Sequence, residues 1–166
     1  MGGKDLELND ELQVEFIVDA GIVKDCELSL PYGVQLSNDK WNLFLPWLGF
    51  EETLIGFLKE GEDVSEGIEV KVYDKGGHEF QMMLKKWVKD SNQFYVLNRG
   101  WFSFCNQHCL EQDDLIALRV FRHAITDILS FVVTFRRMSV AFNWWSIRVR
   151  SCGVISKVGF WVIPGT

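Results

Sequence analysis

The stretch from Gly67 to Arg99, GIEVKVYDKGGHEFQMMLKKWVKDSNQFYVLNR, decides the fold class. Its first residues alternate apolar and polar side chains with the two-residue period of a half-buried strand; the apolar ones are Ile68, Val70 and Val72. Residues 74–77 (DKGG) form a turn signal, because glycine adopts positive φ without steric cost. The alternation then resumes with Phe80, Met82 and Leu84 on one face. These features predict a β-hairpin.

After this hairpin in the sequence, the chain becomes rich in basic and amide side chains before a third predicted strand at residues 94–97. The side chains concerned are Lys85, Lys86, Trp87, Lys89, Ser91, Asn92 and Gln93. Lysines contact phosphates, and amide side chains hydrogen-bond to base edges, adenine in particular. The sequence therefore predicts a cationic loop that contacts nucleic acid. The alternative is a solvated turn whose lysines only keep the hairpin soluble.

Charge is distributed unevenly along the 166 residues, whose formal net charge is −6. Residues 1–69 hold 16 acidic and 4 basic side chains, whereas residues 70–166 hold 7 acidic and 13 basic ones. Such asymmetry allows one surface to attract a polyanion while the opposite surface stays acidic. The 48% hydrophobic content predicts a folded chain, and the length is that of one domain.

The remaining sequence predicts a mainly β, barrel-like domain with two short helices. Residues 1–11 are an acidic leader, and residues 138–166 are an aromatic tail that adds a strand or two, packs over the barrel or is a poorly ordered appendage. We expect further strands at 12–18, 27–30 (ended by Pro31), 115–121 and 128–135, and helices at 51–60 and 101–109.

Neither an enzyme nor a metal protein is predicted. No Ser-His-Asp or Cys-His signature is present, and the carboxylates at residues 60–66 show no acid-base pairing. Cys105, His108 and Cys109 suggest zinc, but a tetrahedral site usually needs a fourth ligand. Buried thiols on an apolar helix face are favoured instead. No apolar run reaches the length of roughly 18–20 residues that a membrane span needs.

Several stretches together resemble the plant B3 DNA-binding domain, particularly its subgroup with a long insertion before the central hairpin. They are residues 27–31 (ELSLP), 67–74 (GIEVKVYD), 84–87 (LKKW) and 94–101 (FYVLNRGW), continued by 110–116 (LEQDDLI) and 121–122 (FR). The resembling domain is residues 12–137, and the tail lies outside it.

This resemblance implies a seven-stranded open pseudobarrel with two short α-helices. It also implies double-stranded DNA as the partner, bound in the major groove by two loop arms without cofactor or metal. The first arm maps to residues 21–26 and the second to residues 87–93. The expected DNA-binding residues are Lys24, Asp25, Cys26, Lys85, Lys86, Trp87, Lys89, Ser91, Asn92, Gln93 and Arg99.

Members of this family are usually transcription regulators in the nucleus, so other transcriptional regulators are further candidate partners. A membrane or a small-molecule substrate is not expected. Glu27 departs from the family, which commonly has a cation there, and its charge repels phosphate. The alternative function is therefore a degenerate B3-like pseudobarrel that acts as a protein-interaction module without binding DNA.

Two aromatic residues and one arginine flank these segments. Trp87 and Trp101 lie at the edges of regular elements, where core packing is favoured over stacking on bases. Arg99 precedes the second predicted helix, whose N-terminus attracts anions. This arginine is either a phosphate contact or an ordinary surface residue.

Overall fold

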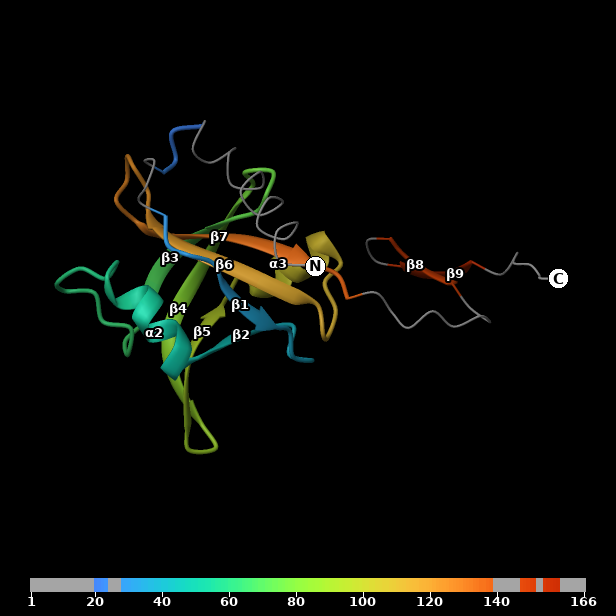
Figure 1. Ribbon diagram of the computed structural model, residues 1–166, viewed down its shortest axis with the longest axis horizontal. Helices are drawn as coiled ribbons and strands as arrows, with labels where there is room; N and C mark the ends of the chain where they lie inside the picture. The colour runs from blue at the N-terminus through green and yellow to red at the C-terminus, as the bar shows by residue number, and fades with distance from the viewer. Residues whose placement is uncertain (1–19, 24–27, 139–146, 152–153, 159–166) are drawn as a thin grey trace, which may run out of the picture.

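A computed structural model describes residues 20–23, 28–138, 147–151 and 154–158. Seven strands of this part form one sheet in the order β1-β6-β7-β3-β4-β5-β2 (Figure 1). The bounds are β1 Tyr32–Gln35, β2 Leu43–Pro46, β3 Ile68–Tyr73, β4 Glu79–Lys89, β5 Asn92–Asn98, β6 Leu115–Arg122 and β7 Leu129–Arg136. Two helices, α2 (Trp47–Ile55) and α3 (Trp101–His108), complete the described domain. The predicted open, mainly β pseudobarrel with two short helices is thus confirmed.

The predicted central hairpin is formed by β3 and β4, which pair from Ile68↔Leu84 to Tyr73↔Glu79. Asp74 closes the turn, because its Oδ1 accepts hydrogen bonds from the backbone N–H groups of Gly76 and His78, each at 2.9 Å. All strand pairs of the seven-stranded sheet are antiparallel, except that β3 and β7 are parallel. The strand order places the β3–β4 hairpin at the centre of the sheet.

The core lies on one face of this sheet and is completed by the two helices. Its largest fully buried side chains include Phe50 from α2, Trp101 and Phe104 from α3, and Phe131 from β7. Trp101 stacks on Phe104 with ring centroids 5.2 Å apart. Core packing, the role favoured for Trp101, is confirmed.

Helix α2 differs from the prediction because it begins and ends earlier than residues 51–60. Pro46 occupies its N-cap position with φ −54° and ψ 129°, which directs the chain from β2 straight into the helix. Trp47, Phe50 and Leu54 follow the helical period and pack toward the core. Sequence reasoning treated Pro46 only as a break, so it missed this start.

The strand predicted before Pro31 is wrong within the described residues 28–30. Ser29 nevertheless contacts β6: its N–H donates to the Val120 carbonyl at 2.9 Å, and its Oγ accepts from Val120 N–H at 2.8 Å. Pro31 has no N–H to extend this ladder. The strand therefore begins after the proline, with Tyr32 opposite Leu118. The predicted leader 1–11 and strand 12–18 lie outside the described residues.

Helix α3 begins where the sequence predicts, against β4. A Cβ atom at Gly100 would lie 2.3 Å from the carbonyl oxygen of Gln81, so only glycine allows this approach. Cys105 is a buried free thiol, and burial raises its pKa to about 12. Cys109 instead caps the helix with φ 54° and is disulfide-bonded, so Cys105 is the buried thiol of these two cysteines.

Three further structural findings concern metals, the tail and membrane spans. Among the described residues, no group of three or more His, Cys, Asp or Glu side chains is arranged to hold a metal ion. In the tail, β8 (Ile147–Ser151) and β9 (Val154–Val158) pair with each other in a separate two-stranded sheet. None of the described helices is long and apolar enough to span a membrane.

An ion pair ties the long connection after α2 to β6. The Arg122 Nη1 atom donates to Glu62 Oε1 at 2.8 Å, and its Nε donates to the Phe57 carbonyl, also at 2.8 Å. Hydrogen bonds and the charge of Arg122 hold the pKa of Glu62 below its usual value. Because the folded state lowers this pKa, the resulting stability is present above the unfolded pKa near 4.3 and is lost as the pH falls through the folded value.

Glu62→Gln is accordingly expected to lower the free energy of unfolding at pH 7 by about 1–2 kcal/mol. The difference from the wild type should shrink as the pH falls from the unfolded pKa near 4.3 toward the lowered folded pKa, because Glu62 itself then becomes protonated. Urea unfolding at pH 7, 5 and 3.5 measures this. An equal difference at all three pH values would show that the carboxylate charge is unimportant.

Candidate nucleic-acid interface

The segment predicted as a cationic loop is mostly a strand extension. β4 and β5 pair continuously from Met83↔Asn98 to Lys89↔Asn92, which leaves only Asp90 and Ser91 for the reversal. Both turn residues have positive φ, 50° and 66°, as in the tight turns that match strand twist. The hairpin projects beyond the rest of the sheet (Figure 1). The expected loop over residues 85–93 was wrong because consecutive lysines hid the strand alternation.

This correction assigns the lysines to opposite faces of the ribbon. Neighbours along a strand point to opposite faces, and directly paired residues share one. Lys85, Trp87 and Lys89 therefore lie on the face that β4 turns away from the core, hereafter the outer face. Lys86 and Val88 lie on the inner face, which continues from the core residue Leu84.

Aromatic side chains brace the outer face of the hairpin. Phe44 of β2 packs edge-on against Phe94 and Trp87, with ring centroids 5.5 Å and 6.2 Å away, respectively. The Nζ atom of Lys89 lies 5.1 Å from the centroid of the Phe44 ring, a cation-π distance. Trp87 is half-buried in this cluster. Trp87 thus packs against aromatic side chains rather than standing free, but the core position favoured for it was wrong, because its ring joins this outer-face cluster and not the main core.

Lys86 has different surroundings from the other two lysines. Its Nζ lies 5.0 Å from the centroid of the Trp47 ring, at the start of α2. Its backbone N–H donates to the Val64 carbonyl at 2.8 Å, beyond the end of the β3–β4 pairing, while β4 stays paired with β5 along its other edge. Lys86 thus joins the hairpin to the long connection between α2 and β3.

The polar residues at the tip of the hairpin are solvent-exposed: Lys89, Ser91, Asn92 and Gln93. The Nδ2 atom of Asn92 donates to the Asp90 carbonyl at 3.3 Å. Asn92 is paired with Lys89 on the outer face, whereas Gln93 is paired with Val88 on the inner one. The two amides therefore present hydrogen-bonding groups on both sides of the ribbon.

The base of the predicted first arm lies on the same outer face. Val23 is buried against Tyr73, Phe121 and Val132 of the sheet, and Ile22 and Leu28 pack beside it. The Ile22 carbonyl also accepts a hydrogen bond from Ala124 N–H at 2.8 Å. Lys24, Asp25 and Cys26 themselves lie outside the described residues, as does Glu27.

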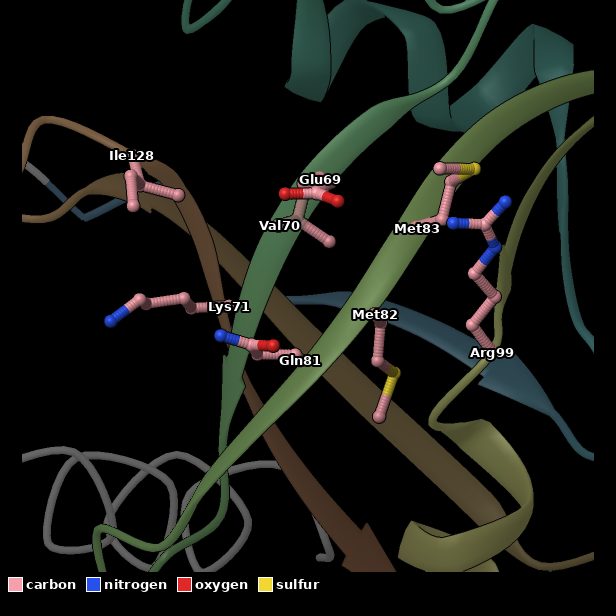
Figure 2. A pocket seen from close by; sticks show the side chains of 8 residues that line it. All are labelled: Glu69, Val70, Lys71, Gln81, Met82, Met83, Arg99 and Ile128. Carbon is pink, nitrogen blue, oxygen red and sulfur yellow. The ribbon is translucent and has the colours of Figure 1, made fainter.

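A groove with a volume of about 370 Å³ lies over the outer face of β3 and β4 (Figure 2). Its lining residues are Glu69, Val70, Lys71, Gln81, Met82, Met83, Arg99 and Ile128. Lys71 is already engaged, since its Nζ lies 2.9 Å from Glu79 Oε1. Burial alone would raise the pKa of Glu79, but hydrogen bonds from Lys71 and Tyr73 outweigh this effect and lower it.

Comparison with protein families and known proteins decides the relationship. The model of the B3 domain-containing protein At2g31720-like family matches residues 46–137. The chain belongs to this B3 domain family.

Two curated Arabidopsis thaliana proteins, each named as B3 domain-containing, are similar to this chain. At4g03170 is 30% identical over 106 residues, which are 63% of this chain and 42% of that protein. At1g20600 is 35% identical over 69 residues, or 42% of this chain and 28% of that protein. The chain thus matches less than half the length of either relative.

Two solved structures were also matched at lower identity. A chain of the Arabidopsis FUS3-DNA complex is 22% identical with a TM-score of 0.47, and the match covers 65% of this chain and 97% of that one. The hypothetical Arabidopsis thaliana protein At1g16640.1 is 19% identical with a TM-score of 0.45, covering 68% and 95%.

Sequence reasoning about the B3 domain missed most of the groove. It identified Arg99, which is exposed with φ 61° directly before α3, but not Glu69, Lys71 or Gln81. The signal was present in the alternation, which already placed these residues opposite the core side of the hairpin. Their exposure in one groove was not apparent because the sequence does not show how far the outer face is covered.

Proposed function

We propose that this B3 domain binds double-stranded DNA sequence-specifically, with two arms in the major groove, as part of a nuclear plant transcription regulator. One observation carries the proposal: Lys85 and Lys89 lie on the outer face of a projecting two-stranded ribbon, and the base of the first arm packs on that same face. A two-stranded ribbon fits the width of the major groove.

Within this proposal the role of each hairpin residue depends on its position in the ribbon. Lys85 and Lys89 contact phosphates, whereas the exposed amides of Asn92 and Gln93 reach base edges, and Ser91 offers a hydroxyl at the tip. Trp87 stabilises the ribbon by packing against Phe44 and does not contact the DNA. Lys86 also belongs to this support, because its cation lies over Trp47 on the inner face. Lys24, Asp25 and Cys26 stay predictions of the family resemblance.

The proposed function requires neither catalysis nor a cofactor. The family supports a transcription-factor type of protein, and the localisation in the nucleus follows from that type rather than from a targeting signal. The relatives are longer than the matched region, so other transcriptional regulators are proposed partners of the whole protein.

A protein-interaction module is the second candidate function, and one observation favours it. Leu48 and Ile55 on α2 are 81% and 63% exposed, and the nearby segment of residues 60–66 is acidic. An apolar surface beside acidic residues suits a basic protein partner better than DNA.

Salt dependence separates these functions. Fluorescence anisotropy of a labelled duplex with the full chain should give an association constant whose logarithm falls linearly with the logarithm of the salt concentration, with a slope of about −0.9 per phosphate contacted. A binding affinity that does not change between 50 and 200 mM salt, or no binding at 50 mM, would contradict DNA binding through phosphates.

A further inference from the structure

The groove on the outer face lies between the described base of the first proposed arm and the β4–β5 hairpin. Along β3, Tyr73 contacts the base of the first arm, and Lys71 and Glu69 follow away from it. Along β4, Met83 lies opposite Glu69, and Lys85, Trp87 and Lys89 then lead into the hairpin. We therefore expect a duplex that spans from the base of the first arm to the hairpin to pass over Glu69 and its neighbours.

The groove carries charges of both signs at one level of the sheet. Glu69 of β3 is paired with Met83 of β4, and Met83 is paired with Asn98 of β5, which directly precedes Arg99. Figure 2 shows the Glu69 carboxylate on one strand and the Arg99 guanidinium beyond Met83. The two side chains thus lie on either side of the methionine.

These two charges are available to a ligand, unlike that of Lys71. Within the described part of the chain, neither Glu69 nor Arg99 has an ion-pair partner within 4.0 Å, whereas Lys71 is paired with Glu79. Both side chains are solvent-exposed. Arg99 therefore offers an unneutralised cation to the groove, and Glu69 an unneutralised anion.

We propose that Glu69 sets the DNA affinity of this domain by opposing a phosphate strand that lies in the groove and contacts Arg99. This inference rests on the proposed DNA binding. Charges separated by less than a Debye length, about 10 Å at 0.1 M salt, interact appreciably even in water. One carboxylate under a phosphate strand therefore counteracts about one favourable phosphate contact, which corresponds to about three- to tenfold in affinity near 0.1 M salt.

Glu69→Gln tests this proposal, with Glu66→Gln as the matched control. Both glutamates are exposed and the change in net charge is identical, but Glu66 lies in the connection before β3 and does not line the groove. In duplex titrations of the full chain at 0.1 M salt, Glu69→Gln should tighten binding about three- to tenfold, and Glu66→Gln by less than about twofold. Arg99→Gln should weaken binding about three- to tenfold.

Each other outcome overturns the proposal in a recognisable way. Equal tightening by both glutamine variants would mean that only net charge matters. If neither Glu69→Gln nor Arg99→Gln changed the affinity while reversal of Lys85 and Lys89 abolished it, the groove assignment would be wrong and DNA binding would stand. If neither the wild type nor any of these variants bound a duplex, both the groove assignment and the proposed function would be wrong. Thermal unfolding of each variant checks that the fold is intact.

Discussion

Replacing Trp101 with alanine is expected to lower the free energy of unfolding by about 3–5 kcal/mol. Trp101 is fully buried in the main core and stacks on Phe104 with an interplanar angle of 15°. The cavity left by the indole cannot close easily, because Gly100 fixes the start of α3 against the Gln81 carbonyl. Chemical denaturation followed by circular dichroism measures the loss.

Trp101→Phe provides the control for this prediction. Phenylalanine keeps most of the buried area, and it removes an indole N–H that has no acceptor among the described residues. The expected cost is therefore below about 1.5 kcal/mol. Equal costs for the two variants, or a cost below about 1 kcal/mol for alanine, would contradict the central position of Trp101 in the core.

Reversing the charge of both outer-face lysines, Lys85→Glu with Lys89→Glu, is expected to weaken duplex binding by at least about 100-fold at 0.1 M salt. A slope of about −0.9 per contact corresponds to roughly tenfold in affinity for each phosphate contact at that concentration, and the new carboxylates add repulsion. The salt slope should also decrease in magnitude by about 2. Anisotropy titrations at several salt concentrations give both quantities.

Lys86→Glu is the matched control, because the same charge is reversed on the same strand but on the inner face. We expect it to change the affinity by less than about threefold, since screening weakens a charge that is not in contact with DNA. Losing the contact with Trp47 should appear as a lower unfolding temperature instead. If Lys86→Glu weakened binding as much as Lys85→Glu, the two-face arrangement would not describe how DNA is held.

The sequence predicts a strand well where the alternation of apolar and polar side chains is clear, and poorly where charged residues interrupt that alternation. The β3–β4 hairpin followed from alternation and from the turn at residues 74–77, because burial of one face allows a single register. The β4–β5 hairpin was mistaken for a loop, since polarity at Lys85, Lys86 and Lys89 outweighed alternation. In the structure these lysines stay in strands because Phe44 and Trp47 pack against the ribbon. Those contacts come from residues distant in sequence.

The candidate site was predictable in composition but not in geometry. Composition identified the lysines and amides of the second arm, and the family resemblance indicated which segments form the arms. The opposite faces of Lys85 and Lys86 required the strand assignment, and the groove with Glu69 and Arg99 required the register of β3, β4 and β5. Helix α2 shows the same limit, because its early start depends on a direct turn from β2 at Pro46.

Selection of DNA by the full chain from a pool of duplexes with a randomised central segment tests the central claim most directly. At 0.1 M salt, repeated selection and sequencing should enrich one short motif. That enrichment should disappear in the variant with Lys85 and Lys89 reversed and change in base preference with Asn92→Ala. A pool that stays random through every round, at 50 mM salt as well, would contradict sequence-specific DNA binding and favour the protein-interaction module.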